Sequence, residues 1–422
     1  MSPRKRSSLP SIAGAQWLAW PGAAKVFTVL GAQGFAIRAV GGAVRDTLLS
    51  RPVHEVDFAT TAPPETVMEL ARDAGLKVIP TGLDHGTVTL IAGGRSFEVT
   101  TLRKDVESCG RRARVAFTDD WLADASRRDF TINALYTDAD GTLQDPLGVI
   151  GDIEARHIRF IGDPRARIRE DYLRILRFFR FHAELGEDEY DASALHACVE
   201  QRGGLDSLSA ERVHCELMRL LSATNAARAL RKMFEYGLLV QLLAGVVFPG
   251  RLENLIAIEA QLGRAPDAVL RLAALAVTGA EDVERLARRL RLPNAGKKRL
   301  VQASAYHGIG ANMDDASLRA RLYTMGRPGC RDTALMAWAA SRDAAENSDW
   351  HDLMTRIRDM PVPEFPLQGA DIVAMGVPRG PAVGRILGEI VSRWKTGDFA
   401  ATRAELLDIA REITRAKLEN PR

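Results

Sequence analysis

The chain has 422 residues, of which 46% are hydrophobic and 26% charged, and its formal net charge at pH 7 is only +3. This length predicts two or more domains with buried cores, and the composition is that of an ordinary globular protein. No apolar run approaches the roughly 18 residues that a membrane span needs, so we expect no membrane contact. Arginine, the side chain best suited to phosphate contacts, outnumbers lysine, which is compatible with RNA binding.

Cysteine placement and the N-terminus set further limits. Residues 1–10 carry three basic side chains but no apolar segment follows, so they predict a short disordered tail and no signal peptide. The cysteines lie far apart without a CxxC motif, which argues against a zinc site or a disulfide framework and favours a reducing cytoplasm. They are Cys109, Cys198, Cys215 and Cys330.

Residues 34–162 show an α+β pattern, in which short strand-like runs alternate with helical ones. Strands are predicted at residues 35–40, 56–60, 87–92, 96–102 and 130–136, and helices at residues 64–74 and 120–126. This alternation is typical of a catalytic domain with a sheet and helices.

Beyond residue 163 the pattern is almost entirely helical. Asp163 and Pro164 form a good N-cap and N1 pair, which predicts a helix that continues to Arg180. Three prolines within residues 361–366 predict a boundary before a helical tail. Other helices are predicted at residues 210–221, 226–236, 251–262, 267–278, 280–291 and 318–325.

The first candidate site follows the strand predicted at residues 35–40. Gly41 and Gly42 precede a helix start, and Arg45 lies on its first turn. Glycines allow close approach of the backbone and a helix N-terminus presents free N–H groups, which suits a phosphate cradle. On its own, a Gly-Gly pair more often marks an ordinary tight turn.

Two carboxylates, Glu55 and Asp57, begin the next predicted strand. Their i, i+2 spacing places both side chains on one face, where they repel each other unless a cation lies between them. Mg²⁺ is the expected cation, since it takes a few carboxylates and completes its shell with water and substrate phosphates. Alone, the pair would more readily indicate a solvated strand face.

Further charged motifs follow in a fixed order along the chain. They are residues 96–103 (SFEVTTLR, containing Glu98), 128–135 (RDFTINAL), 145–148 (DPLG), 170–174 (EDYLR, followed by Arg177 and Arg180) and 208–213 (LSAERV, followed by Glu216). Each motif alone is a weak signal, but a chance match of the whole ordered set is negligible.

In order and spacing, these motifs resemble the class II CCA-adding enzymes and bacterial poly(A) polymerases of the polymerase-β-like nucleotidyltransferase superfamily. The resemblance covers about residues 35–220. It implies an α+β fold, with an N-terminal nucleotidyltransferase head on a mixed sheet followed by an all-helical neck, body and tail. The implied parts are an N-terminal tail (1–22), the head (23–162), a neck with the nucleotide-recognition helix (163–222), a body (223–360) and a tRNA-contacting tail (361–422).

The resemblance also implies the reaction and its residues. The 3′-hydroxyl of tRNA attacks the α-phosphate of CTP or ATP without a nucleic-acid template, pyrophosphate leaves, and two Mg²⁺ ions assist. No obligate protein partner is evident. Glu55 and Asp57 would bind the metal, with Glu98 as the third catalytic carboxylate, and the nucleotide would be held by Gly42, Arg45, Arg128, Asp171, Arg174, Arg177 and Arg180.

Base choice has a physical basis in one pair of residues. In a continuous helix, Asp171 and Arg174 would lie side by side at i, i+3, the first accepting and the second donating hydrogen bonds. Cytosine and adenine both offer an amino donor beside a ring-nitrogen acceptor, whereas uracil and guanine offer the reverse. The pair therefore predicts selection of CTP and ATP, although such a pair elsewhere would be an ordinary surface ion pair.

Three features depart from the family pattern or need another explanation. Glu55 stands where the family usually has an aspartate, so its carboxylate reaches about one methylene further. Ser50 stands where a glycine usually ends the first helix. Residues 103–114, rich in arginine, correspond to a mobile loop in the family and are by composition a solvated loop.

Three alternative functions stay open at this point. A poly(A) polymerase would add A only, but residues 81–88 (TGLDHGTV) resemble the CCA-adding side of the family. A partial enzyme would add only CC or only A, and the sequence does not separate these. A catalytically inactive RNA-binding protein is suggested by Glu55 and opposed by the retention of Asp57, Glu98 and the arginines.

Overall fold

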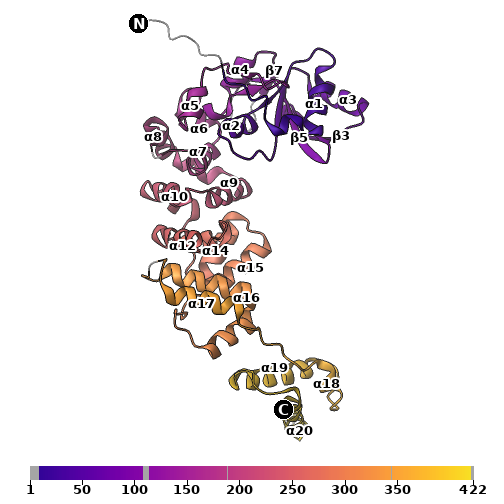
Figure 1. Cartoon of the computed structure of the whole chain (residues 1–422), viewed down its shortest axis with the longest axis vertical. Helices are drawn as coiled ribbons and strands as arrows, with labels where there is room; N and C mark the ends of the chain where they lie inside the picture. Colours follow the sequence, from indigo (N-terminus) through magenta and orange to yellow (C-terminus); the bar gives the residue numbers. More distant parts are fainter. Residues whose placement is uncertain (1–8, 108–113, 188, 344, 420–422) are drawn as a thin grey trace. The chain divides into compact units, whose positions relative to one another are not determined.

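The computed structural model describes residues 9–107, 114–187, 189–343 and 345–419, which belong to two compact units, Met1–Leu242 and Leu243–Arg422 (Figure 1). Within these residues, no helix is long and apolar enough to cross a lipid bilayer. Cys198, Cys215 and Cys330 are free thiols, while Cys109 lies outside the described residues.

A seven-stranded mixed sheet forms the centre of the first unit, with the strand order β3-β4-β5-β2-β1-β8-β9. Neighbouring strands are antiparallel except β2 and β5, which are parallel. A separate hairpin pairs β6 with β7. The strands are β1 (Ile37–Val40), β2 (Asp57–Thr60), β3 (Lys77–Gly82), β4 (Thr87–Ala92), β5 (Arg95–Thr101), β6 (Arg103–Glu107), β7 (Arg114–Phe117), β8 (Tyr136–Thr137) and β9 (Leu143–Gln144).

Helices α1 (Pro21–Gly31) and α3 (Pro64–Asp73) pack against the sheet and each other, so the sheet has a well-filled core. The ring of Phe58 on β2 lies 4.9 Å from that of Phe27 and 5.9 Å from that of Phe97. Gly22 permits this close contact, because a Cβ there would lie 2.5 Å from the Ala92 carbonyl oxygen. The strands that carry the candidate carboxylates are therefore rigidly supported.

The rest of the first unit is helical. Four phenylalanines join the head to helix α7: the Phe130 and Phe160 rings lie 4.6 Å apart, Phe160 lies 5.8 Å from Phe178, and Phe130 lies 5.3 Å from Phe181. This cluster fixes α7 beside the head. The α-helices are α2 (Gly42–Leu48), α4 (Trp121–Ser126), α5 (Ile150–Glu154), α6 (Pro164–Glu170), α7 (Leu173–Glu184), α8 (Ala192–Glu200), α9 (Ala210–Ser222), α10 (Ala226–Glu235) and α11 (Leu238–Leu243), with short 3₁₀ segments at Gln16–Ala19, Leu83–His85, Thr131–Asn133 and Arg202–Ser207.

Four of the five predicted strands are confirmed, and the fifth is wrong. Residues 130–136 form a 3₁₀ turn at Thr131–Asn133 and reach the sheet only at β8, while Phe130 makes a single bridge to Phe160. This run is apolar because it is buried, not because it pairs along its length. The edge strand β3, which the sequence did not predict, contains Pro80, and proline is tolerated at sheet edges.

Ser50 occupies a backbone conformation that favours glycine. Its φ is 54°, in the left-handed region, directly after the C-cap Leu49 of α2. The departure from the family's glycine is thus a local strain at an exposed turn.

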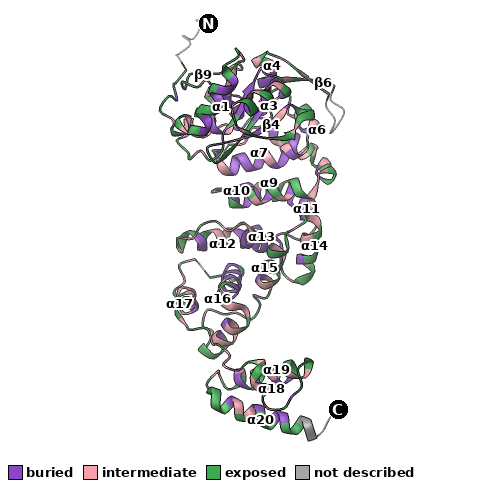
Figure 2. Cartoon of the chain, turned by 90° about the vertical axis from the view of Figure 1, so that its right-hand side faces the viewer, coloured by how far each residue is buried: buried purple, intermediate pink, exposed green. Residues whose placement is uncertain are grey.

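The second unit is entirely helical. Its helices are α12 (Pro249–Gln261), α13 (Ala268–Ala276), α14 (Ala280–Leu290), α15 (Asn294–Ser304), α16 (Asp315–Ala340), α17 (Ser348–Asp359), α18 (Gly369–Val373), α19 (Pro381–Thr396) and α20 (Arg403–Glu419). The stacked rings of Trp338 and Trp350, 5.8 Å apart, join α16 to α17. The helices of this unit carry both buried and exposed residues (Figure 2).

The helix predicted at residues 318–325 is confirmed, including its end, although it begins three residues earlier at Asp315. Gly326 has φ 71° and ψ 165°, which interrupts the helix, and Pro328 then lies on the first turn of a second segment that continues to Ala340. Gly326 and Pro328 thus mark a kink between two helical segments, and the second segment was not predicted.

Candidate active site

Three carboxylates lie together where β2 begins. The parallel pairing of β2 with β5 sets Phe58 opposite Val99, which places Asp57 next to Glu98 on the adjacent strand. Glu55 precedes β2 by two residues; all three residues reach the surface, although neighbouring protein atoms desolvate the Asp57 carboxylate in part. The predicted catalytic carboxylates thus lie on, or just before, two adjacent central strands of the sheet.

The electrostatics of this group suit a cation. Desolvation by the surrounding protein, and then the charges of Glu98 and Glu55, raise the pKa of Asp57 to about 6, while Arg128 partly opposes them. In the described part of the chain, no three His, Cys, Asp or Glu side chains form a ready-made metal site. A metal here would therefore use few protein ligands and would need substrate phosphates, as Mg²⁺ usually does.

This pKa predicts how stability depends on pH and metal. Because the folded state holds the Asp57 proton more tightly than the unfolded state, wild-type stability falls as pH rises from about 4 through 6, and the loss persists above 6. We expect Asp57→Asn to raise the Tm of the metal-free protein, more at pH 7.5 than at pH 5. At pH 7.5, Mg²⁺ should reduce the difference in Tm between Asp57→Asn and the wild type, because it stabilises only the wild type.

Thermal melts in EDTA and in Mg²⁺ would measure this effect. Asp73→Asn, at an exposed aspartate in the last turn of α3, is the matched control and should show no such pH dependence. A Tm difference for Asp57→Asn that is equal at both pH values would contradict the repulsion among the carboxylates.

The glycine turn before α2 has the expected strained geometry. Gly41 adopts φ 73° and ψ −119°, which L side chains rarely reach, and a Cβ on Gly42 would lie 3.8 Å from the Arg45 guanidinium. Arg45 itself is only 8% exposed; it donates to Asn133 at 2.7 Å and to Asp46 at 3.0 Å. Arg45 therefore supports the turn from beneath, and a phosphate would meet the glycine backbone first.

Arg128 is held by a buried acid that the sequence analysis did not identify. Asp124, 1% exposed, accepts hydrogen bonds from Arg127 at 2.6 Å, Arg128 at 3.0 Å and the Tyr136 hydroxyl at 2.9 Å. The two arginines hold the pKa of Asp124 below its usual value despite burial. The i, i+4 spacing of Asp124 and Arg128 was the available signal.

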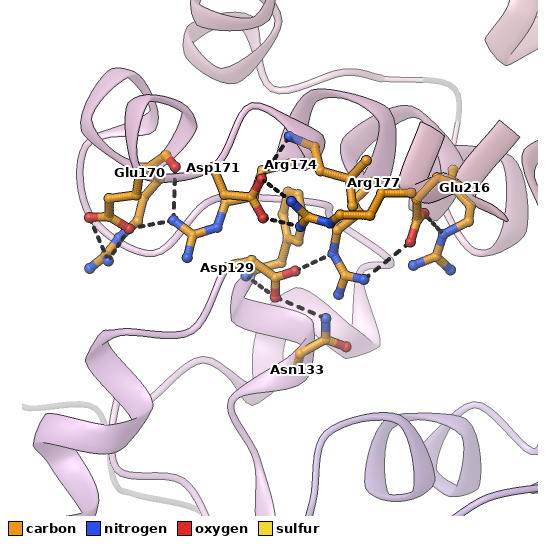
Figure 3. Close-up of polar contacts among 12 residues, drawn as sticks. Asp129, Asn133, Glu170, Asp171, Arg174, Arg177 and Glu216 are labelled. Atoms are coloured by element: carbon orange, nitrogen blue, oxygen red, sulfur yellow. Dashed lines mark hydrogen bonds and ion pairs between the residues drawn. The ribbon is translucent and has the colours of Figure 1, made fainter. Parts of the chain in front are cut away.

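A chain of ion pairs connects the head to α7 and α9 (Figure 3). Asp129 accepts from Asn133 at 3.2 Å and from Arg177 at 2.7 Å. Arg177 and the buried Arg180 both donate to Glu216 of α9, at 3.4 Å and 2.6 Å. The predicted nucleotide residues Arg177 and Arg180 are thus brought together, but largely to lock α7 against α9.

The recognition helix is not continuous, which corrects the prediction for residues 163–180. Helix α6 ends at Glu170, and Asp171 is extended with φ −155° and ψ 105° before α7 begins. Asp171 accepts from the Leu173 N–H at 3.1 Å, so its side chain caps the start of α7. A side-chain hydrogen bond to a backbone N–H can replace helical hydrogen bonding. At Asp171 this bond accompanies the break between α6 and α7.

The side chains of Asp171 and Arg174 do not bond each other; only the Arg174 N–H donates to the Asp171 carbonyl, at 3.0 Å. Arg212 donates to both carboxylate oxygens of Asp171, at 3.2 Å and 2.6 Å, whereas Arg174 donates to the Arg167 carbonyl at 2.8 Å and to Glu170 (Figure 3). Each predicted recognition group therefore has its own support. Arg212 belongs to the LSAERV motif, but its contact with Asp171 needed the fold to be seen.

Comparison with known proteins places this geometry in a family. Residues 37–159 match the family model described as poly A polymerase head domain, and residues 191–247 match the one described as probable RNA and SrmB-binding site of polymerase A. The CCA tRNA nucleotidyltransferase 1, mitochondrial, of Danio rerio is 35% identical over 379 residues, covering 88% of this chain and 86% of that protein. The chain belongs to the CCA tRNA nucleotidyltransferase family.

Other members of the CCA tRNA nucleotidyltransferase family are similarly related. The CCA-adding enzyme of Geobacillus stearothermophilus is 33% identical, covering 90% of this chain and 94% of that protein. The crystal structure of the Bacillus stearothermophilus CCA-adding enzyme in complex with CTP has a TM-score of 0.72 at 28% identity, covering 94% of this chain and 98% of that one. The predicted family and fold class, a mixed-sheet head followed by helices, are confirmed.

The individual site roles remain predictions for this family member. The structure brings Glu55, Asp57 and Glu98 together near Arg128 and places Asp171 and Arg174 at the α6–α7 junction. Of the arginine-rich loop, residues 108–113 lie outside the described residues, and the flanking segments form β6 and β7.

Proposed function

We propose that the chain adds C, C and A to the 3′ end of tRNA from CTP and ATP, releasing pyrophosphate, without a nucleic-acid template. The observation that carries this proposal is the pairing of β2 with β5, which sets Asp57 beside Glu98 with Glu55 two residues away; desolvation, and then the charges of Glu98 and Glu55, raise the pKa of Asp57. Without a counter-ion, three neighbouring carboxylates repel one another. A divalent cation bound together with a nucleoside triphosphate would relieve this repulsion.

Mg²⁺ is the metal that we propose, held by Glu55 and Asp57. When bound, it would favour the ionised 3′-hydroxyl and neutralise charge on the phosphates. Glu55 lies in the segment before β2, and its charge acts on Asp57. The donor set consists only of carboxylate oxygens, which is the ligand type that Mg²⁺ prefers.

The nucleotide and tRNA would meet this chain in different places. The Gly41–Gly42 turn and Arg128 would face the triphosphate, and Asp171 with Arg174 would face the base, while Arg45, Arg177 and Arg180 hold these groups in position. The tail at residues 361–422 is proposed to contact tRNA. The five-part division of the chain and a cytoplasmic location also remain proposals.

Primer extension would test this function directly. Transcripts of tRNA ending in N, NC and NCC are incubated with each NTP and Mg²⁺, and products are resolved at single-nucleotide length. We expect CTP to extend the first two transcripts, ATP alone to extend the third, and extension to stop after A. Repeated ATP addition on any RNA would instead indicate a poly(A) polymerase, and no addition would indicate an inactive RNA-binding protein.

A further inference from the structure

A basic pocket lies in the second unit, outside the nucleotidyltransferase site. It has a volume of about 590 Å³ and is formed by the end of α12, the second segment of α16 and the face of α17. Helix α16 packs against both α12 and α17 (Figure 1). This volume lies within the range of pockets that enclose small organic ligands.

Four guanidinium groups line this pocket, from Arg264, Arg327, Arg331 and Arg358, and none of its lining residues is acidic. Two of the four have structural duties. Arg327 donates to the carbonyl of Met360 at 2.9 Å and to two carbonyls at the end of α17, while Arg358 pairs with the adjacent Asp359 at 2.7 Å. Arg327 nevertheless keeps its charge, because carbonyls solvate a cation without neutralising it.

The other two arginines have no comparable structural partner. Among the described residues, the Arg264 side chain makes no hydrogen bond or ion pair, and Arg331 has only a long contact of 3.5 Å to Asp332. The Nε atom of Arg331 is buried and has no hydrogen-bond acceptor. Asp332 is already engaged by Arg299, which donates to it at 2.7 Å and to Asp267 at 2.9 Å and 2.5 Å.

Arg299, in the same unit, is an example of an arginine with a purely structural role. Its guanidinium is saturated by two carboxylates. Arg331 lacks such saturation, and its side chain is 36% exposed, so a ligand anion in the pocket can pair with the accessible part of its guanidinium. Arginine forks match phosphate oxygens in bidentate geometry better than they match water.

The pocket also has an apolar side, which limits the ligand class. Leu262, Met354 and Ile357 line it together with the imidazole of His351. A bare phosphate would leave most of this volume and apolar surface unused, whereas a nucleotide carries both an anionic group and a flat, weakly polar base. Arginine planes and apolar side chains both accept a base by stacking.

We propose that this pocket is a second nucleotide site, which binds the phosphate through Arg264 and Arg331 and the base against Leu262, Met354 and Ile357. The nucleotide is either free or part of an RNA chain, since both carry the same phosphate and base chemistry. The site is separate from the catalytic carboxylates, so its occupancy does not depend on the proposed reaction.

Hydrogen–deuterium exchange of the full-length protein, read peptide by peptide, tests this proposal. In EDTA, AMP is the free-nucleotide probe, adenosine lacks the phosphate, and a tRNA transcript supplies nucleotides in a chain. We expect AMP, and not adenosine, to slow exchange in peptides from residues 258–264 and 348–359. The double variant Arg264→Gln/Arg331→Gln should weaken this protection about tenfold or more, since two charge-assisted contacts are lost.

Controls separate this site from the head and from misfolding. Arg342→Gln, at an exposed arginine after α16, should protect like the wild type, and the single variant Arg264→Gln should show a partial loss with an unchanged Tm. Protection by tRNA alone that the double variant loses would support the site with RNA as the source. The proposal is overturned if neither ligand protects these peptides, or if the double variant is protected as well as the wild type.

Discussion

Asp57→Ala is expected to abolish nucleotide addition and leave tRNA binding largely intact. Asp57 lies at the start of β2 beside Glu98, and desolvation together with the charges of Glu98 and Glu55 raises its pKa. Losing it removes one of the two proposed metal ligands, and phosphoryl transfer depends mainly on positioning and charge neutralisation. We expect the rate of CMP addition to fall by about three orders of magnitude or more.

The measurement is a single-turnover rate of CMP addition to a tRNA ending in NC, at saturating Mg²⁺ and CTP, with tRNA affinity measured in parallel. Asp73→Ala removes an exposed carboxylate from α3 of the same unit and should leave both quantities unchanged. Retained turnover by Asp57→Ala in Mg²⁺ would remove Asp57 from the proposed site. A loss of tRNA binding equal to the loss of rate would indicate that the variant is misfolded.

Much of the head's fold could be predicted from the sequence, because its strand patterns and helix-start residues agree with the tertiary structure. Strands β1, β2, β4 and β5 have apolar residues that are buried in the sheet, and the Pro64 start of α3 fits its helix N-terminus. Two elements differ from those predicted by the sequence pattern, one because of burial and one because of a side-chain hydrogen bond. Residues 130–136 are apolar through burial alone, and Asp171 ends a helix by capping the next one.

The sequence indicated which residues are candidates for the site, but it did not indicate which hydrogen-bond partners hold most of them in place. The acids Glu55, Asp57 and Glu98 converge because β2 and β5 are adjacent and parallel, which motif order only implied. The i, i+4 spacing of Asp124 and Arg128 hinted at their ion pair, whereas the support of Asp171 by Arg212, forty-one residues later, depends on tertiary packing that no spacing rule encodes. Arg45 and Arg180 are buried and hydrogen-bonded to Asn133 and Glu216, a support that the sequence did not indicate, and their nucleotide contacts stay predictions.

Asp171→Ala is expected to collapse discrimination between CTP and UTP. Arg212 occupies both carboxylate oxygens of Asp171 through one fork, but an ionised carboxylate has about four acceptor positions. The oxygens therefore retain capacity to accept from the amino group of cytosine or adenine while Arg212 holds them in place. Arg174, fixed by Glu170 and the Arg167 carbonyl, supplies the complementary donor for the ring nitrogen.

Removing the Asp171 carboxylate leaves Arg174 and the released Arg212 as donors without that acceptor. The carbonyl groups of uracil and guanine can then accept from these arginines, so the penalty against UTP and GTP should disappear. The expected change in the ratio of kcat/KM values is a few kcal/mol at most, because only one or two hydrogen bonds differ, or about 10–100-fold. A fall in the rate with CTP alone would say nothing about base choice.

The decisive quantity is the CTP/UTP preference, measured on a tRNA that ends in NC. Asp163→Asn, at the N-cap of α6, removes a carboxylate from the same region while keeping a capping side chain, and it should retain the wild-type preference. If Asp171→Ala also retains it, base recognition through an Asp171 acceptor is wrong. Selectivity would then have to come from another group near the triphosphate, of which Arg128, fixed by Asp124 and Tyr136, is the best-positioned candidate.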